Sequence, residues 1–91
     1  MSEPMEQMIN IGFGNYANRM KIVAIVTPDS APAKRMIQSG KDNGTVIDAT
    51  QGRKTRAAII MENHKIILSA VHPETLASRC ADKIQNDTLG Q

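Results

Sequence analysis

The stretch TVIDATQGRKTRAAIIMENHKIILS, residues 45–69, decides the fold. Three short runs rich in β-branched and aliphatic residues lie within it, at 45–50, 55–61 and 65–69. Runs of this length, bounded by turn residues, predict three strands joined as a meander. The dipeptide Gln51-Gly52 predicts a hairpin turn after the first strand, with Arg53 and Lys54 at its tip. Hairpin connections favour an antiparallel sheet over a parallel one.

Upstream of this stretch, the sequence predicts two more strands and a helix. Residues 8–11 and 20–26 are short apolar runs, and the glycine-rich segment 12–15 ends the first of them in a tight turn. Ser30 is a good N-cap for the helix that follows, and Gly40 and Gly44 are expected to end it.

Downstream, a second helix is predicted over residues 73–85, because Pro73 suits a first helical turn and apolar side chains recur at helical spacing. The predicted order is β-β-α-β-β-β-α, an α+β fold with a small, mostly antiparallel sheet and two helices. We expect a single domain over residues 8–85, with a flexible N-terminus at 1–7 and a flexible tail at 86–91.

The composition fits one small cytoplasmic domain. The chain has 91 residues, of which 41% are apolar, and carries 11 Lys and Arg against 9 Asp and Glu. Its single cysteine, Cys80, has no partner for an intramolecular disulfide, as expected in a reducing compartment. No apolar run reaches the length of a membrane span, and the acidic N-terminus is unlike a signal peptide. A monomer of this size buries a small core, so we expect it to oligomerise.

Enzymatic chemistry has little support in the sequence. Gly12 and Gly14, followed by Ala17, formally match a dinucleotide-binding fingerprint, but a β-branched strand follows where that fold needs a helix. The two histidines, His64 and His72, lie eight positions apart and match no metal-ligand spacing. We therefore expect no catalytic residues, no cofactor and no metal.

The positive charge is concentrated in the middle of the chain. Residues 19–65 hold nine basic and four acidic side chains, a net charge of +5, whereas the flanks hold two and five, a net charge of −3. The densest basic motif is Arg53, Lys54 and Arg56. Arginine pairs with phosphate oxygens or a guanine edge, and lysine contributes a point charge, so this motif suits a nucleic acid. The alternative is a solvated turn without a ligand. Asp48 is also a candidate ion-pair partner for Arg56.

Aromatic residues are scarce, which favours a duplex ligand over a single strand. Only Phe13 and Tyr16 are aromatic, so stacking on exposed bases can contribute little. Three rival functions remain open from the residues alone. They are an RNA-binding accessory protein, a structural oligomer whose basic patch recruits an acidic partner, and a small enzyme that holds a nucleotide at its glycine turn.

Several colinear segments carry a resemblance to a known family. They are residues 9–15, 17–19, 30–32, 34–38, 47–50, 52–53, 55–57, 66–71 and 73–75. In these segments the sequence resembles the bacterial extracellular matrix regulator RemA family. The resemblance implies a DNA-binding transcriptional regulator that assembles into ring-like homo-oligomers. In the best known members it is an activator of matrix and biofilm genes.

The resemblance also implies which residues contact DNA. The family's arginine pair after the hairpin glycine falls on Arg53 and Lys54, and lysine keeps the charge but loses the planar fork. A further family arginine falls on Arg19, with Lys21 as the alternative occupant of that position. We therefore expect a cytoplasmic, nucleoid-associated homo-oligomer that binds double-stranded DNA. The expected DNA-binding residues are Arg19, Lys21, Arg53, Lys54 and Arg56.

Overall fold

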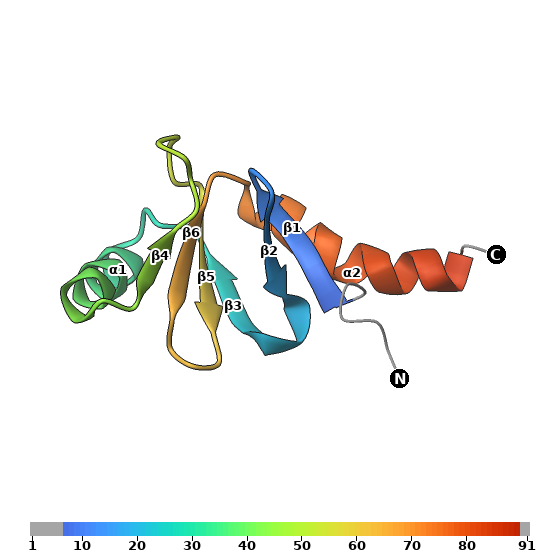
Figure 1. The fold of residues 1–91 in the computed structure, drawn as a ribbon, viewed down its shortest axis with the longest axis horizontal. Helices are drawn as coiled ribbons and strands as arrows, with labels where there is room; N and C mark the ends of the chain where they lie inside the picture. The colour runs from blue at the N-terminus through green and yellow to red at the C-terminus, as the bar shows by residue number, and fades with distance from the viewer. Residues whose placement is uncertain (1–6, 90–91) are drawn as a thin grey trace.

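Two sheets and two α-helices make up the fold in the computed structural model, which describes residues 7–89, with side chains described as far as Ala81 (Figure 1). The elements are β1 (Met8–Gly12), β2 (Asn15–Asn18), the 3₁₀ turn η2 (Arg19–Lys21), β3 (Ile22–Val26), α1 (Ala31–Asn43), β4 (Val46–Asp48), β5 (Ala57–Met61), β6 (Ile66–Ser69) and α2 (Pro73–Leu89). This order confirms the predicted α+β class and adds one strand, β2, which pairs antiparallel with β1.

The larger sheet has the strand order β3-β5-β6-β4. Strands β3 and β6 both pair antiparallel with β5, as in the predicted antiparallel sheet. A tight turn links β5 to β6, in which the amide of Met61 donates to the carbonyl of Lys65 at 2.9 Å. The predicted hairpin over residues 62–64 is therefore confirmed.

The predicted hairpin between the strands at 45–50 and 55–61 is wrong. Strand β4 lies beside β6, not β5, and runs parallel to it, with Val46 opposite Ile66. The reason is the occupancy of β5, whose two edges are taken by β3 and β6. Strand β4 therefore pairs at the outer edge of β6. Residues 49–56 form a crossover loop that leads from the end of β4, past the end of β6, to the start of β5. Neighbouring strands lie about 5 Å apart, so the loop spans two strand spacings.

The predicted caps of α1 at Ser30 and Gly44 are confirmed, but the expectation that Gly40 also ends the helix is wrong, because Gly40 lies inside α1, where it packs closely against β4. The hydroxyl of Ser30 accepts a 3.2 Å hydrogen bond from the amide of Ala33, which satisfies a donor of the first turn. Gly44 adopts a left-handed conformation, with φ of 75°, and its amide bonds back to the last turn. Helix α2 runs beyond its predicted end at 85, so residues 86–89 are helical. Residues 1–6 and 90–91 lie outside the described residues, and the flexibility expected of both ends stays a prediction.

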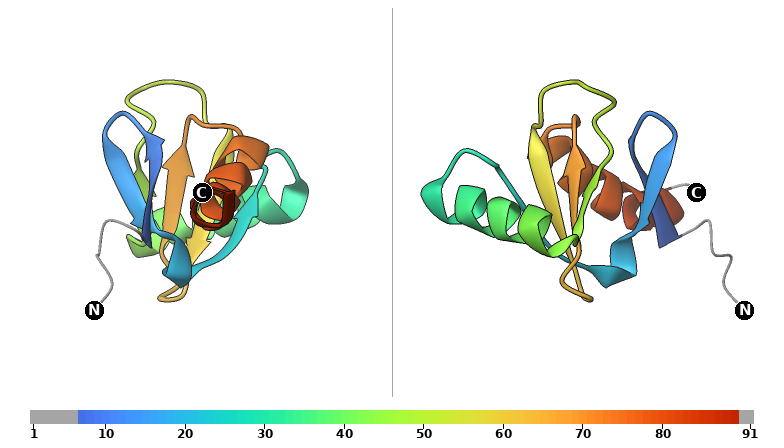
Figure 2. Two further views of the ribbon diagram at one scale, coloured as in Figure 1. Left: turned by 90° about the vertical axis from the view of Figure 1, so that its right-hand side faces the viewer. Right: turned by 60° about the vertical axis from the view of Figure 1, so that its left-hand side comes forward.

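The four-stranded sheet is covered on both faces. Successive residues of β5 alternate between two apolar clusters, so that Ile59 joins one cluster and Ala58 the other. The first cluster includes β1, β2 and Leu76 of α2, and the second includes Ile37 of α1. Helix α1 thus covers one face, and the β1-β2 sheet with α2 covers the other (Figures 1 and 2). Within the described part of the chain, no helix has the length and apolar character needed to cross a membrane.

Candidate nucleic-acid interface

The crossover loop 49–56 carries the densest basic motif and has a fixed base. Its turn is closed by a 2.9 Å hydrogen bond from the amide of Arg53 to the carbonyl of Thr50. The two central residues, Gln51 and Gly52, have φ of 54° and 80°, as a type I′ turn requires. Thr50 is buried, with 2% of its surface exposed. The loop therefore presents Arg53 from an ordered turn.

Asp48 holds the start of this loop. Its Oδ1 accepts hydrogen bonds from the hydroxyl of Thr50 at 2.6 Å and from the amide of Thr50 at 2.9 Å. These two bonds, with a smaller effect from the charge of Lys41, hold the pKa of Asp48 below its ordinary value. Among the described side chains the ion pair joins Lys21 and Glu62, so the predicted pairing of Asp48 with Arg56 is wrong.

Three basic side chains surround one hollow at the tip of the loop. Arg53, Lys54 and Arg56 are exposed and line it together with Phe13 and Ala70. The amide of Arg56 donates to the carbonyl of Ser69 at 2.8 Å, which fixes the end of the loop to β6. The structure therefore brings together three of the five predicted site residues, in a concave surface that suits an anionic group.

Phe13 is a member of this site that the sequence did not reveal. It lies at the tip of the β1-β2 turn, between Gly12 and Gly14, with half of its surface exposed. The guanidinium carbon of Arg53 lies 6.0 Å from the centre of its ring. The one sequence signal was an aromatic residue between two glycines, a placement unsuited to a core residue. Its partner, 40 positions away in the chain, could not be read from that signal.

Acidic side chains border the basic loop on one side. A second hollow contains Lys54 and Arg56 together with Asp29, Glu74 and His72. The two carboxylates lie where the chain leaves β3 and where α2 begins. They oppose the approach of an anion from that side, so the hollow lined by Phe13 and Arg53 is the more favourable one for phosphate.

Arg19 and Lys21 lie at the opposite end of the sheet from the loop. They form η2, directly before β3, where Ile22 pairs with Met61 at the far end of β5. Arg56 directly precedes the near end of the same strand. Five residues of β5 separate the two ends by about 13 Å. The structure does not bring these two predicted site residues together with the other three.

The two candidates for the family arginine position have different surroundings. Arg19 is half-buried, and its Nη1 donates to the carbonyl of Cys80 in α2 at 3.3 Å, while its buried Nε has no hydrogen-bond partner among the described residues. Burial raises the pKa of the Cys80 thiol, against a smaller opposite effect of the Arg19 charge. Lys21 is exposed, and its Nζ lies 3.7 Å from Oε1 of Glu62. Lys21 therefore presents its charge to solvent, whereas Arg19 packs against α2.

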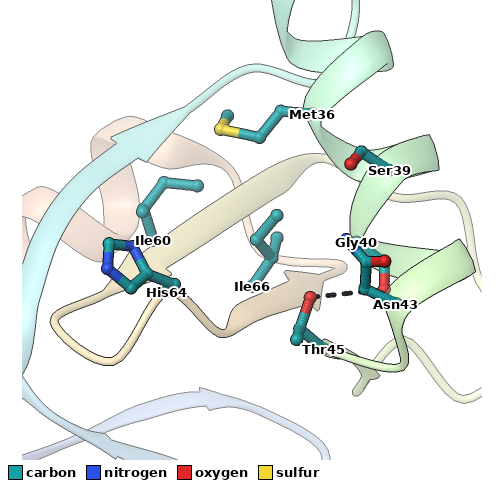
Figure 3. A pocket seen from close by; sticks show the side chains of 8 residues that line it. All are labelled: Met36, Ser39, Gly40, Asn43, Thr45, Ile60, His64 and Ile66. Carbon is teal, nitrogen blue, oxygen red and sulfur yellow. Dashed lines mark hydrogen bonds between the residues drawn. The ribbon is translucent and has the colours of Figure 1, made fainter.

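Another concavity lies between α1 and the four-stranded sheet (Figure 3). Its walls include the apolar side chains of Met36, Ile60 and Ile66, with His64 at one side. None of the basic residues of the crossover loop lines it. Among the residues that the structure describes, no three His, Cys, Asp or Glu side chains are grouped to hold a metal ion. The loop is thus the best-defined candidate site.

Comparison with known proteins establishes the family. The family model described as "RemA-like: Extracellular matrix regulatory protein A-like" matches residues 8–80. The chain belongs to the RemA-like family. The matched range contains both helix starts, strands β1 to β6 and the crossover loop. The family resemblance seen in the sequence is confirmed.

Relatives of similar length share about half of their residues with this RemA-like chain. A Clostridium botulinum protein is 52% identical over 85 residues, which cover 93% of each chain. A Desulfitobacterium hafniense protein is 54% identical over 82 residues, 90% of each chain. A Bacillus pumilus protein is 54% identical over 85 residues, 93% of this chain and 96% of its own. Each is named as an inferred regulatory protein, so the RemA-like family and its members support a regulatory role.

Proposed function

We propose that this RemA-like chain is a transcriptional regulator that binds duplex DNA through the crossover loop 49–56. The observation that carries the proposal is the gathering of Arg53, Lys54 and Arg56 around one hollow, on a loop whose two ends are hydrogen-bonded to the fold. Fixed cationic groups can neutralise neighbouring phosphates and release their counterions, which is the main source of non-specific DNA affinity. The regulatory names of the relatives agree with this role.

The three basic side chains have different parts in the proposed contact. Arg53 and Arg56 carry planar forks that can pair bidentately with a phosphate or a guanine edge. Lys54 adds a point charge that suits phosphate alone. Three contacts from one copy give weak binding in physiological salt, because each contact adds a limited, salt-dependent increment. Repetition of the site in an oligomer supplies the remaining affinity.

We infer that the oligomer is a ring formed by head-to-tail contacts. Strands β3 and β4 are the two edges of the larger sheet, and each exposes an apolar side chain. Val23 on β3 is 66% exposed and Ile47 on β4 is 49% exposed. Two different apolar edges on one subunit support a heterologous contact, which closes into a ring when the rotation between copies permits. Light scattering of the purified chain gives the number of copies.

Lys21 and Arg19 have a secondary place in the proposal. They lie beyond the far end of β5, a strand about 13 Å long, and the loop lies before its near end. An exposed Lys21 can reach DNA that passes along that end of the molecule or binds an adjacent copy. Arg19 is the weaker candidate, because its guanidinium is already bonded to α2.

The direct test is duplex-DNA binding against salt concentration, with Arg53→Ala and Lys54→Ala combined in one variant. We expect this variant to lose affinity and to have a shallower salt dependence, by up to about 0.9 in log–log slope for each phosphate that is no longer neutralised. The matched control combines Lys34→Ala with Arg35→Ala, which removes the same charge from exposed positions of α1.

Oligomeric state is measured in the same samples. If both double variants lose affinity equally, the loop is not the binding site. If RNA of the same sequence displaces the duplex at equal concentration, the RNA-binding alternative replaces the proposal. If only an acidic protein binds, the basic loop serves protein recruitment instead.

The proposed regulatory target is a set of extracellular matrix genes, as the family description suggests. Such a regulator acts in the cytoplasm, at the nucleoid, and in a biofilm-forming cell its loss would lower matrix gene expression. Chromatin immunoprecipitation with the wild type and the Arg53→Ala, Lys54→Ala variant tests this. Enrichment of the same promoters by both proteins would contradict the assigned site.

A further inference from the structure

Two turns from different sheets meet at one end of the molecule. The β1-β2 turn and the crossover loop 49–56 both lie at the upper end in Figures 1 and 2. Phe13 at the tip of the first turn and Arg53 in the second form a cation–π contact, with 6.0 Å from the guanidinium carbon to the ring centre. The same two side chains line one hollow. The charge pattern of the loop explains why Arg53 is at this site, but it does not explain why the ring of Phe13 lies against it.

Core packing does not account for Phe13. Half of its surface is exposed, and it belongs to neither of the two apolar clusters. Its backbone has φ of 56°, a conformation that costs energy for any residue with a side chain other than glycine. Core packing therefore does not explain why an exposed ring is held in a strained turn. Among the described residues, the cation that lies over this ring is that of Arg53.

We propose that Phe13 is a positioning residue for Arg53, which holds the guanidinium against its ring so that Arg53 meets DNA in a preset orientation. The proposal rests on the DNA-binding function proposed above. A guanidinium that lies over a ring keeps the N–H groups at its edge free for a bidentate contact. An arginine that is already oriented loses less rotamer freedom on binding than a free one, so the ring raises affinity without touching DNA.

Both members of the pair are fixed to the same buried residue. The hydroxyl of Ser69 donates to the carbonyl of Ile11, two positions before Phe13, at 2.7 Å. The carbonyl of Ser69 accepts from the amide of Arg56, three positions after Arg53, at 2.8 Å. The spacing of the two turns is therefore set by strand β6, and the contact is built into the fold rather than made by two free loops.

Specificity follows from the difference between the three basic residues. Among the described side chains, Lys54 and Arg56 contact no aromatic ring. Arg53 is then the residue whose plane is fixed, and it is the one suited to a base edge, while Lys54 and Arg56 contact phosphate. Removal of the ring should weaken binding to a preferred duplex more than binding to an unrelated duplex.

The test compares Phe13→Leu, which removes the ring, with Phe13→Tyr, which keeps it. Neither variant is a glycine, so both place a side chain on the same positive-φ backbone. We expect Phe13→Leu to weaken duplex-DNA binding about 2- to 5-fold, the range of an exposed cation–π contact, and Phe13→Tyr to bind like the wild type. Tyr16→Leu is the matched control, because Tyr16 is the other exposed aromatic residue and no cation of the described side chains lies over its ring.

A double-mutant cycle separates positioning from direct contact with DNA. If Phe13 acts through Arg53, then Phe13→Leu has no further effect in the Arg53→Ala background. An undiminished effect in that background would overturn the proposal, because it would show that the ring itself contacts DNA. Equal binding by Phe13→Leu and the wild type would also overturn it.

Side-chain NMR of Arg53 gives a readout that needs no DNA. Ring currents should shift its Cδ protons upfield in the wild type and in Phe13→Tyr, and this shift should vanish in Phe13→Leu. Unshifted protons in the wild type would show that the two side chains do not meet. If the shift is present but the wild type does not bind duplex DNA, the DNA-binding function fails, while the contact itself stands.

Discussion

The hydroxyl of Ser69 donates a 2.7 Å hydrogen bond to the backbone carbonyl of Ile11 and thereby joins β6 of the larger sheet to β1 of the smaller one. Ser69 is fully buried, and its hydroxyl oxygen also accepts a 3.0 Å bond from the amide of Val71. One small side chain thus satisfies a donor and an acceptor that would otherwise lie unpaired away from water. It also fixes the β1-β2 turn relative to the crossover loop.

Replacement of Ser69 by alanine should lower the free energy of unfolding by about 1–3 kcal/mol. The decrease arises because the buried Ile11 carbonyl and the partly buried Val71 amide are left without this partner. Urea unfolding measures the effect. Ser39→Ala is the control, because Ser39 is exposed on α1 and its replacement should be neutral or slightly stabilising. Equal stabilities of the two variants would show that the buried bond contributes nothing net.

Acid should loosen the start of the crossover loop. The hydrogen bonds from Thr50 hold the pKa of Asp48 below its ordinary value of 3.8. A group with a depressed folded-state pKa stabilises the fold above its unfolded-state pKa, and this contribution is lost as the pH falls through the folded-state value. The stability of the wild type relative to Asp48→Asn should therefore shrink as the pH falls from neutral to below the ordinary pKa of aspartate.

Thr50→Val is the companion variant for this experiment. It removes the hydroxyl that is the largest cause of the pKa shift, while the size of the buried side chain hardly changes. The pH-dependent part of the stability should be smaller in Thr50→Val than in the wild type. Urea unfolding of the three proteins over the same pH range gives the comparison, and three parallel curves would contradict the role assigned to Asp48.

The features that could be predicted from the sequence are those set by near neighbours in the chain. Ser30 and Gly44 mark the ends of α1 because a cap depends on a few adjacent residues. The apolar runs predict β3, β5 and β6 because a strand needs little more than β-branched composition and flanking turns. The basic motif 53–56 could also be predicted, because its three charged residues are near neighbours in the chain.

The features that could not be predicted depend on which segments meet in space. The run 45–50 forms a strand as predicted, but its partner is β6, since both edges of β5 are already paired. The contact of Phe13 with Arg53 depends on the packing of two sheets. The bond from Arg19 to α2 spans 61 positions, and no local pattern reports it.

Gly40 is a glycine that packing requires, inside helix α1. A Cβ at this position would lie 2.7 Å from Cγ2 of Val46 and 3.1 Å from the hydroxyl of Thr45, which forces β4 away from the helix. Alanine usually stabilises a helix by about 1 kcal/mol relative to glycine, but overpacking costs about 1–3 kcal/mol. Gly40→Ala should therefore lower stability, whereas Ser39→Ala, one position earlier, should not. A rise in the melting temperature of Gly40→Ala would show that β4 adjusts freely.

Replacement of Arg19 should lower stability, whereas replacement of Lys21 should leave it nearly unchanged. Arg19→Gln should cost about 1 kcal/mol of stability, because it removes the bond to the Cys80 carbonyl. Lys21→Gln should stay within about 0.5 kcal/mol of the wild type, because an exposed ion pair with Glu62 contributes little. Urea unfolding at low and moderate salt measures both, and a larger destabilisation in the lysine variant would reverse the assignment.

Lys54 should behave as a phosphate contact rather than a reader of bases. It is exposed at the hollow, and no aromatic ring among the described side chains fixes the position of its charge. Lys54→Arg keeps the charge, so the salt dependence of DNA binding should not change, and the preference among duplex sequences should stay within about twofold. Lys54→Gln should make the log–log slope shallower by about 0.9 for each phosphate that the lysine neutralises in the wild type.

Lys34→Gln is the control for this pair, because it removes an equal charge from the exposed face of α1. Its slope should match that of the wild type if DNA follows the loop rather than the helix. A large increase in sequence preference by Lys54→Arg would contradict the assignment, because only a planar fork in reach of a base edge could produce it. In that case an arginine at position 54 would also contact base edges, although no aromatic ring orients it. The ring of Phe13 would then not be the reason why Arg53 contacts a base.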